Sequence, residues 1–343
     1  MKSFWILDFG VSIERFKRGK VLCIALCTML LVLSFSAAAQ QEAEKIPRIG
    51  YLHFRAGPSD VDKAFVQGLR NLGWIEGKNI IIEYRWAAGK RERYQALAEE
   101  LVRLKVDLIV TALRSVTQAA KNATSTIPIV MASSPDAVEN GLVASLARPG
   151  GNVTGMSEQH ADISTKLLEL LHESLPNVTR VAWLGENTTS LVAVRIIRAL
   201  QAAAPGLGLT IQPFTARKPE DLDSLSEAAS QGRTGAMMVS GSTYSRLRRP
   251  IARLAAKNRI PVLSLNWPLI EKHFGILGYG PDYPDMYRRA ATYVDKILKG
   301  RKPADLPIQR PVKYTLIVNL KTAKEIGLTI PAHVLARADL VIK

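Results

Sequence analysis

The residues of this chain that could bind a small molecule are hydroxyl, amide, carboxyl and aromatic side chains gathered in short polar segments. Hydroxyl groups and free backbone N–H groups at helix N-termini form a site for a carboxylate or another anion. Helix capping or core packing explains any single one of these side chains equally well, so only the whole set carries weight. The segments are residues 55–60 (RAGPSD), 111–115 (TALRS), 132–136 (ASSPD), 185–190 (GENTTS), 241–245 (GSTYS) and 266–267 (NW), and Tyr51, Tyr244, Trp267 and Tyr279 could add aromatic faces. The candidate ligand-binding residues are Tyr51, Ser59, Thr111, Ser115, Ser134, Asp136, Asn187, Ser242, Thr243, Asn266 and Tyr279.

The sequence holds few of the patterns that are typical of catalysis. The five histidines form no H-x-x-x-H pair and no H-E-x-x-H helix, which argues against a zinc site. Neither a G-x-S-x-G elbow nor a G-x-x-x-x-G-K-S/T loop is present, and residues 149–152 (PGGN) resemble a phosphate loop only in their glycines. His172 is expected to be a structural residue with its hydrogen bonds satisfied. The sequence predicts a protein without catalytic activity, cofactor or metal ion, although a triad assembled from distant residues leaves no local pattern.

The first forty residues have the pattern of a secretory signal peptide. Basic residues precede an apolar run at 21–35 (VLCIALCTMLLVLSF), and Ala37, Ala38 and Ala39 supply a cleavage site. An uncleaved anchor is the alternative, but the run is shorter than the roughly 20 residues of a membrane span. We expect residues 1–39 to be removed and the mature protein to be soluble and periplasmic. Both cysteines, Cys23 and Cys27, fall in the leader, so the mature chain would have no disulfide and no thiolate chemistry.

The formal net charge of +16 raises the question of nucleic-acid binding. The basic residues are scattered, as at 90–93 and 246–253, and no helix-turn-helix, zinc-finger spacing or aromatic ribonucleoprotein motif is present. Solvated helix surfaces explain the charge, and we expect no nucleic-acid partner. A general electrostatic preference for anionic ligands or membrane surfaces is the remaining alternative.

The elements that must position the candidate residues alternate between short apolar strands and amphipathic helices. Strands are predicted at 48–54, 79–84, 106–111 and 127–131, with helices between them, and the alternation then begins again at residue 163 and continues to 279. Strands rich in Ile and Val and separated by helices form parallel sheets buried on both faces. The fold class is therefore α/β, with two Rossmann-like parallel-sheet lobes. In such sheets, ligands bind outside the carboxyl ends of the strands, where the polar segments lie.

The tail belongs to neither run and implies that the chain recrosses a hinge. It contains a predicted helix at 282–298, a Pro-containing linker at 300–311, a strand at 314–318 and a last helix from about residue 331. We expect residues 46–160 and 281–311 to form lobe 1, and residues 161–280 and 312–343 to form lobe 2. Two lobes joined by several crossing strands open and close as rigid bodies.

Several blocks of sequence resemble the ABC-transporter substrate-binding family that includes the tryptophan- and tyrosine-binding proteins. They span essentially the whole mature chain: residues 71–74 (NLGW) with 77–79 (GKN), 136–138 (DAV), 141–155 (GLVASLARPGGNVTG), 279–283 (YGPDY), 293–300 (YVDKILKG), 303–307 (PADLP), 318–323 (VNLKTA) and 330–331 (IP). The family usually has Asp-Pro-Val where this chain has Asp-Ala-Val. The resemblance implies a type I periplasmic binding fold, with ligand contacts at strand ends that include Ser115, Asp136, Asn187, Thr243 and Asn266.

The resemblance also implies a function: an exported solute-binding protein of an ABC importer that closes around a small, amino-acid-like molecule. Its partners would be an ABC permease in the membrane and a separate ATPase, and we expect a monomer. Two alternatives stay open. A periplasmic ligand-sensing receptor subunit would have the same fold, and an exported hydrolase would act at the same cleft.

Overall fold

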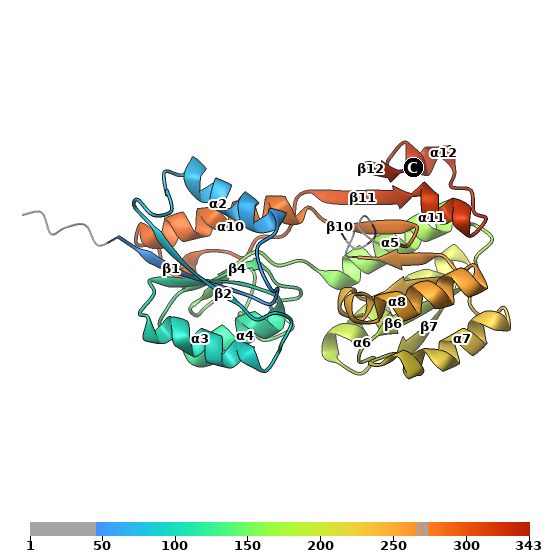
Figure 1. Cartoon of the computed structure of the whole chain (residues 1–343), viewed down its shortest axis with the longest axis horizontal. Coiled ribbons are helices and arrows are strands. Elements are labelled where there is room, and N and C mark those ends of the chain that lie inside the picture. The colour runs from blue at the N-terminus through green and yellow to red at the C-terminus, as the bar shows by residue number, and fades with distance from the viewer. Residues whose placement is uncertain (1–45, 266–267, 269, 271–273) are drawn as a thin grey trace, which may run out of the picture. The chain divides into compact units, whose positions relative to one another are not determined.

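The computed structural model describes residues 46–265, 268, 270 and 274–343 (Figure 1). The chain divides after Ile46, and Pro47–Lys343 is one compact unit. The predicted signal peptide, both cysteines, Asn266, Trp267 and His273 lie outside the described residues. Within them, no helix combines the length and the hydrophobicity that a membrane crossing requires.

The first sheet of the described chain contains five strands, all parallel, in the order β2-β1-β3-β4-β5. The central strands β3 and β4 are buried at every residue, as expected for a sheet covered on both faces. The three-residue β5 was not predicted, because it is too short to show a pattern. The bounds are β1 Arg48–His53, β2 Ile81–Trp86, β3 Leu108–Ala112, β4 Ile129–Ser133 and β5 Val153–Gly155.

Two pairs of helices cover this sheet (Figure 1). Helices α3 (Arg93–Arg103) and α4 (Arg114–Ala123) pack on one face, and α2 (Asp60–Asn71) and α10 (Tyr283–Leu298) pack on the other. Although α10 lies far from α2 in sequence, the two helices run side by side. Their contact is close at Gly68, where an added Cβ would lie 2.7 Å from the Arg288 carbonyl oxygen. The predicted helix at 282–298 therefore completes the first sheet's core.

The second sheet of the described chain contains seven strands in the order β12-β11-β10-β9-β8-β6-β7. All neighbouring pairs are parallel except β10 and β11. The helix predicted from about residue 331 is present as α12 (Ala332–Leu335), but it is a single turn, and the chain ends in strand β12 instead of in that helix. The bounds are β6 Arg180–Gly185, β7 Thr210–Thr215, β8 Ala236–Val239, β9 Val262–Ser264, β10 Leu277–Pro281, β11 Tyr314–Asn319 and β12 Leu340–Ile342.

Helices also cover both faces of the second sheet. Helices α5 (His160–Ser174) and α6 (Leu191–Ala203), with α11 (Leu320–Glu325) and α12, pack on one face, and α7 (Asp223–Ser230) and α8 (Gly241–Asn258) on the other. Helix α8 begins six residues before the predicted start because two helical segments meet at a kink at Leu247. Short 3-10 turns complete the described elements: η1 Ala204–Leu207, η2 Pro219–Leu222 and η3 Pro303–Asp305.

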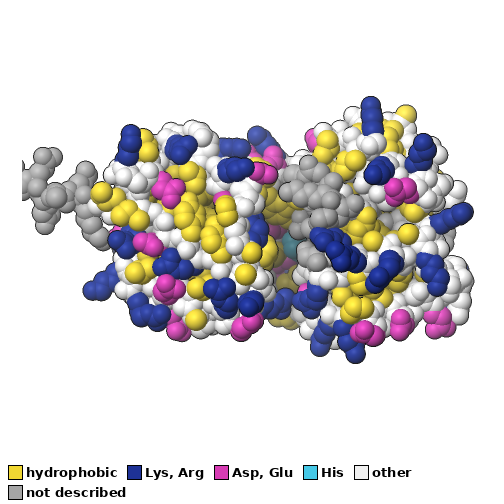
Figure 2. Space-filling view, viewed as in Figure 1, with side chains coloured by type: hydrophobic (Ala, Val, Ile, Leu, Met, Phe, Trp, Pro, Cys, Tyr) yellow, Lys and Arg dark blue, Asp and Glu magenta, His cyan; other side chains and the backbone are white. Residues whose placement is uncertain are grey.

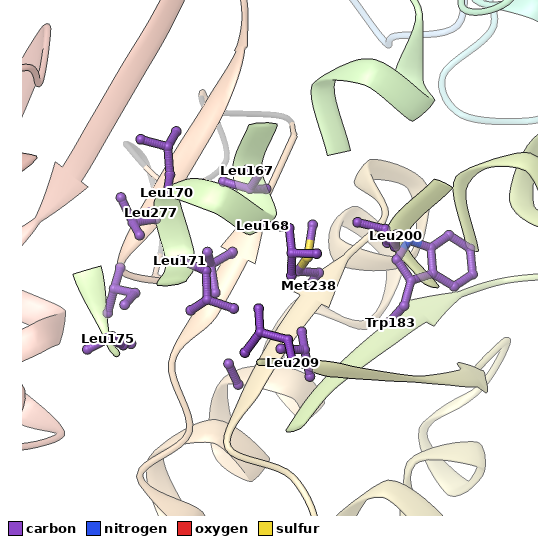
Figure 3. Packing of buried hydrophobic residues seen from close by; sticks show 14 of the residues in the cluster. Leu167, Leu168, Leu170, Leu171, Leu175, Trp183, Leu200, Leu209, Met238 and Leu277 are labelled. Carbon is purple, nitrogen blue, oxygen red and sulfur yellow. The ribbon is translucent and has the colours of Figure 1, made fainter. Parts of the chain in front are cut away.

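Leucines of α5 form the centre of the second sheet's core (Figure 3). Leu167, Leu168 and Leu171 are completely buried against Trp183 of β6 and Met238 of β8. Burial of one leucine side chain stabilises a fold by about 1.5–3 kcal/mol. This packing fixes the strands and therefore the positions of the polar segments at their carboxyl ends.

Charged side chains of both signs are interleaved on the surface seen in Figure 2. Ion pairs of the described chain include those of Glu186 with Arg91 at 3.2 Å and with Arg246, and that of Arg195 with Glu139 at 3.0 Å. This face of the described chain therefore has mixed charges instead of a stripe of one sign.

Candidate functional site

The carboxyl ends of β1, β3, β4 and β5 meet at one edge of the first sheet, because these strands are parallel. Polar and charged residues follow three of them. Arg55 follows β1, Ser134 and Asp136 follow β4, and Glu158 follows β5. We define the carboxyl-edge cluster as Ser133, Ser134, Asp136 and Glu158.

Glu158 is the most deeply buried carboxyl group of the cluster, with 2% of its surface exposed. One oxygen, Oε1, accepts a 2.9 Å hydrogen bond from Ser133 Oγ. The other, Oε2, is buried and has no hydrogen-bond partner. Burial raises the pKa of Glu158, and the nearby His160 opposes the rise. A buried carboxyl oxygen without a hydrogen-bond partner lowers the free energy of unfolding, because its desolvation is not compensated.

Asp136 lies beside Glu158 in a left-handed backbone conformation, with φ of 50°. Its backbone N–H donates to the Glu158 carbonyl oxygen at 2.8 Å, and its carboxylate accepts a hydrogen bond from the backbone N–H of His160, at the start of α5. Burial raises the pKa of Asp136 to about 6, while the His160 N–H and Arg195 oppose the rise. Asp136 therefore joins the edge of the first sheet to α5, the helix that packs on the second sheet.

The alanine at position 137 has a structural role in this turn. Its backbone N–H donates a 3.1 Å hydrogen bond to Ser157 Oγ. A proline there, as in the usual family pattern, has no N–H and could not make this bond. This hydrogen bond joins the segments that follow β4 and β5.

Ser134 is fully buried, and its hydroxyl has no hydrogen-bond partner. Along β4, Val130 and Ala132 face α10, whereas Ile129 and Met131 face α3 and α4. By this alternation, Ser134 continues on the α10 face. Burial raises the pKa values of Tyr283 and Tyr287 of α10, and the charge of Glu158 raises them further. Glu158 therefore lies close enough to α10 to influence these two tyrosines.

A second buried network surrounds Asp62 of α2. The hydroxyl of Tyr51 donates to Asp62 Oδ1, and the Arg55 guanidinium pairs with Asp62 Oδ2. The backbone N–H of Ser59 donates to Oδ2 at 2.6 Å, and Ser59 Oγ lies 3.1 Å from it. Burial raises the pKa of the Tyr51 hydroxyl. The polar atoms of Tyr51 and Ser59 are therefore engaged in holding Arg55 and the start of α2.

His53 joins the Asp62 network to α10. The backbone N–H of Arg55 donates to its Nδ1 at 3.2 Å, and its Nε2 lies 2.9 Å from the Tyr287 hydroxyl. Burial, reinforced by Arg55, lowers the pKa of His53 to about 2, so the ring is neutral. Because Nδ1 is an acceptor, Nε2 carries the hydrogen and donates it to Tyr287. His53 thus holds the Tyr287 hydroxyl of α10 in place relative to the backbone at Arg55.

The other candidates of the first sheet lie on β3 and α4. Thr111 is buried and its hydroxyl lies 2.9 Å from that of Thr117, which in turn donates to the Leu113 carbonyl oxygen. Ser115 is half-buried in the first turn of α4. The Thr111 hydroxyl is therefore hydrogen-bonded inside the protein, whereas Ser115 remains partly accessible to solvent.

The candidates of the second sheet are also divided between internal and exposed positions. Thr243 is fully buried and accepts a 2.9 Å hydrogen bond from Ser240 Oγ, whereas the neighbouring Ser242 is exposed. Asn187 is exposed, and its side-chain oxygen accepts hydrogen bonds from Thr189. Tyr279 is half-buried and stacks on Tyr314, with 5.6 Å between ring centroids. Asn266 lies outside the described residues.

Sequence reasoning missed the residues that do most to define the site. Glu158 and Ser133 were not candidates, because β5 was not predicted and the segment after it therefore had no assigned edge. His172 was expected to be satisfied, but its Nδ1 is buried without a partner, so that expectation is wrong. Within the described residues, no group of three or more His, Cys, Asp or Glu side chains could hold a metal ion.

Comparisons with known proteins agree with the fold. The tyrosine-binding protein of Clostridioides difficile (strain R20291) is 27% identical over 292 residues, covering 84% of this chain and 83% of that protein. An ABC domain from Streptococcus pneumonia, solved in complex with L-Trp, has 26% identity and a TM-score of 0.77, covering 86% of this chain and 99% of that one. A glucose-galactose binding protein from Geobacillus stearothermophilus, at 12% identity, shares the fold alone, with a TM-score of 0.59 and coverage of 80% and 98%.

These solved structures are periplasmic binding proteins of the type I fold, and this chain has the same α/β architecture of two sheets. A family model described as "ABC transporter substrate binding protein" matches residues 56–342, almost the whole described chain. The chain therefore belongs to the ABC transporter substrate-binding protein family.

Proposed function

We propose that this protein binds an amino acid and delivers it to an ABC importer. The observation that carries the proposal is the carboxyl-edge cluster, which gathers carboxyl and hydroxyl groups where parallel sheets bind ligands. The amino-acid class is supported by two relatives, one named a tyrosine-binding protein and one solved with L-Trp.

The proposed mechanism is closure of two lobes around the ligand. Lobe 1 consists of residues 46–160 and 281–311, and lobe 2 of residues 161–280 and 312–343. The candidates of lobe 1 are Tyr51, Ser59, Thr111, Ser115, Ser134 and Asp136, and those of lobe 2 are Asn187, Ser242, Thr243, Asn266 and Tyr279. A ligand stabilises the closed state only by the difference in its affinity for the two states. Among the hydroxyl-bearing candidates, Ser59, Ser115, Ser242 and Tyr279 keep accessible surface in the described structure.

The proposal includes the cellular setting of the protein. The leader, residues 1–39, directs export and is removed, and the mature chain acts in the periplasm. The closed form is recognised by an ABC permease whose ATPase is a separate chain. The protein performs no chemistry on the ligand, and the importer uses it as a monomeric carrier.

A thermal-shift screen of residues 40–343 against amino acids, sugars and nucleosides tests the function. We expect stabilisation that grows with the concentration of one class of ligand, because binding to the folded state alone raises the free energy of unfolding. Incubation of the bound ligand with protein, followed by mass spectrometry, should return it unchanged. Silence across the whole panel contradicts the solute-binding proposal, and conversion of the ligand would favour the hydrolase instead.

A further inference from the structure

We propose that the amino edge of the first sheet is a surface that binds anionic phospholipid bilayers. The inference goes beyond the proposed function and does not depend on it, because in this all-parallel sheet the amino edge lies opposite the carboxyl-edge cluster. Two sets of exposed side chains carry it. The apolar edge residues are Ile46, Leu72 and Ile75, and the basic edge residues are Arg70, Lys78, Arg103, Lys105, Arg301 and Lys302.

The loops that precede β2 and β3 meet at the start of β1. The Ile81 N–H donates to the Pro47 carbonyl oxygen at 2.9 Å, and the Asp107 N–H donates to the Arg48 carbonyl oxygen at 2.7 Å. Strand β1 lies between β2 and β3 in the sheet. Ile46, which immediately precedes Pro47, is therefore flanked by both loops.

The loop between α2 and β2 is held in a defined shape. The Ile75 N–H donates to Asn79 Oδ1 at 2.6 Å, and Asn79 Nδ2 donates to the Gly73 carbonyl oxygen at 2.8 Å. The indole of Trp74 donates a 2.9 Å hydrogen bond to Asp295, in the last turn of α10. This bond brings the basic segment that follows α10 to the same edge of the sheet.

The apolar edge residues remain exposed although the loop is fixed. Ile46, Leu72 and Ile75 keep 46%, 36% and 40% of their surface exposed. Single exposed apolar side chains need no explanation, but three on adjoining segments form an apolar group rimmed by polar residues. Insertion into the interface of a bilayer removes such side chains from water, which is favourable.

The basic edge residues have positive charge that the protein does not neutralise. Within the described residues none of the six forms an ion pair, whereas Arg48 and Lys299 of the same edge pair with carboxylates at 3.1 and 2.7 Å. The connecting loops of this edge carry fewer exposed carboxylates, Glu76 and Asp305. The edge is therefore complementary in charge to an anionic surface.

Helix capping explains only part of this charge. Arg70 and Arg103 lie in the last turns of α2 and α3, where the helix dipole favours a cation. The other four basic edge residues lie beyond the ends of the helices, and the dipole effect falls off within the last turn. Their position is accounted for by a partner outside the protein.

The combination of exposed apolar and basic side chains favours a bilayer over an acidic protein or a nucleic acid. Each Lys or Arg near an anionic bilayer strengthens adsorption by about fivefold, and the interface also accepts apolar side chains. A nucleic acid or an acidic protein surface pairs with the cations alone. Adsorption at this edge holds the protein at a membrane while the carboxyl edge remains accessible to a ligand.

Sedimentation of residues 40–343 with lipid vesicles tests the inference. The anionic vesicles contain equal parts of phosphatidylglycerol and phosphatidylethanolamine, and phosphatidylcholine vesicles are the neutral comparison. The basic-edge variant carries Arg70→Gln, Lys78→Gln and Arg301→Gln together, and a second variant carries Ile75→Ser. All four side chains are exposed, so circular dichroism should show that both variants are folded.

The matched control removes the same charge from another surface. It carries Arg249→Gln, Arg253→Gln and Lys257→Gln, three exposed side chains of α8, on the second sheet. Because salt screens charges beyond about 10 Å at 0.1 M ionic strength, substitutions on α8 act weakly on a bilayer at the amino edge.

We expect the partition coefficient of the unmodified protein for anionic vesicles to exceed that for neutral vesicles by about tenfold or more, and to fall as salt is added. The basic-edge variant should lower it by about tenfold or more, and Ile75→Ser by about threefold. The α8 control should change it by less than about threefold. Ligand binding should be the same in all variants, since none of these side chains lies at the carboxyl edge.

Four results overturn the inference. They are the absence of adsorption to anionic vesicles, equal adsorption to neutral vesicles, an unchanged coefficient in the folded basic-edge variant, and equal losses in that variant and the α8 control. Retention on heparin without adsorption to vesicles would assign the edge to an acidic macromolecule instead. None of these outcomes affects the proposed transport function, which fails only if ligand binding is absent.

Discussion

The Ser133 hydroxyl, at the end of β4, donates a 2.9 Å hydrogen bond to the buried carboxyl group of Glu158, three residues after β5. This bond joins the two segments that follow neighbouring strands, and the N–H of Asp136 joins them again at the Glu158 carbonyl oxygen. Contacts between the ends of β4 and β5 therefore hold Ser133, Asp136 and Glu158 of the carboxyl-edge cluster together.

Replacing Glu158 with Gln should stabilise the ligand-free protein at pH 7.5. The amide has nearly the same shape and cannot ionise, so it avoids the desolvation that raises the pKa of Glu158. We expect the free energy of unfolding to rise by about 1–2 kcal/mol, within the range found when buried charges become neutral. Urea denaturation measures it. A loss of stability of that size would mean that the ionised carboxylate is favourable in the ligand-free fold.

Replacing Asp136 with Asn should change how stability depends on pH. A carboxyl group whose folded-state pKa is about 6, above its ordinary value of 3.8, stabilises the fold below pH 3.8 and loses that contribution as the pH rises through 6. Between pH 3.5 and 7.5 the variant should gain about 3 kcal/mol relative to the unmodified protein, at 1.36 kcal/mol per pKa unit. Urea denaturation across this range measures the difference.

The groups that face Asp136 set the limits of that experiment. His160 and Asp162 lie on α5, Arg195 on α6 and Glu158 after β5, and all of them influence its titration. The difference between variant and unmodified protein removes the titration that both proteins share, and it includes the change in the Glu158 titration that follows loss of the Asp136 charge. A difference that stays constant over the whole pH range would contradict the raised pKa.

Replacing Asp62 with Ala should weaken the first sheet's half of the protein. The change leaves the Tyr51 hydroxyl and the Arg55 guanidinium without the carboxylate that pairs them. Removing one partner of a buried charged pair costs about 3–5 kcal/mol of unfolding free energy. The control is Asp60→Ala on the same helix, whose exposed pair with Lys63 at 3.0 Å should matter by less than about 1 kcal/mol. Equal effects of the two substitutions would refute a structural role for the Asp62 network.

Replacing Gly155 with Ala should disrupt the short strand that leads to Glu158. Gly155 has φ of 124°, and an added Cβ would lie 2.3 Å from the Met131 carbonyl oxygen. We expect a loss of about 3 kcal/mol or more in unfolding free energy, from backbone strain together with the clash. Gly151→Ala is the control, since no heavy atom lies within 4 Å of its added Cβ. Thermal unfolding of the two variants should differ clearly, and similar midpoints would contradict the close β4–β5 contact.

The sequence predicted the α/β class and most elements because buried parallel strands have a strong apolar pattern. Its errors came from tertiary contacts. Strand β2 begins at Ile81 instead of residue 79, since its register with β1 pairs Ile81 with Arg48. Strands β5 and β12 have three residues each and form only where a neighbouring strand is present.

The site was less predictable than the fold. Their position at a strand end identified Ser134 and Asp136 as candidates. That position does not reveal which side chains form hydrogen bonds inside the protein. Alternation along β1 sends Tyr51 into the core between α2 and α10, where its hydroxyl bonds to Asp62. Glu158 depends on the unpredicted β5, and its unpaired oxygen is a property of three-dimensional packing that no local pattern reveals.

The most direct test of the account is a calorimetric titration of residues 40–343 with each common amino acid. The account predicts saturable binding of at least one amino acid with one site per chain and a dissociation constant of about 10 μM or lower, equivalent to roughly −7 kcal/mol. The absence of saturable heat with every amino acid, from a protein that circular dichroism shows to be folded, would contradict it.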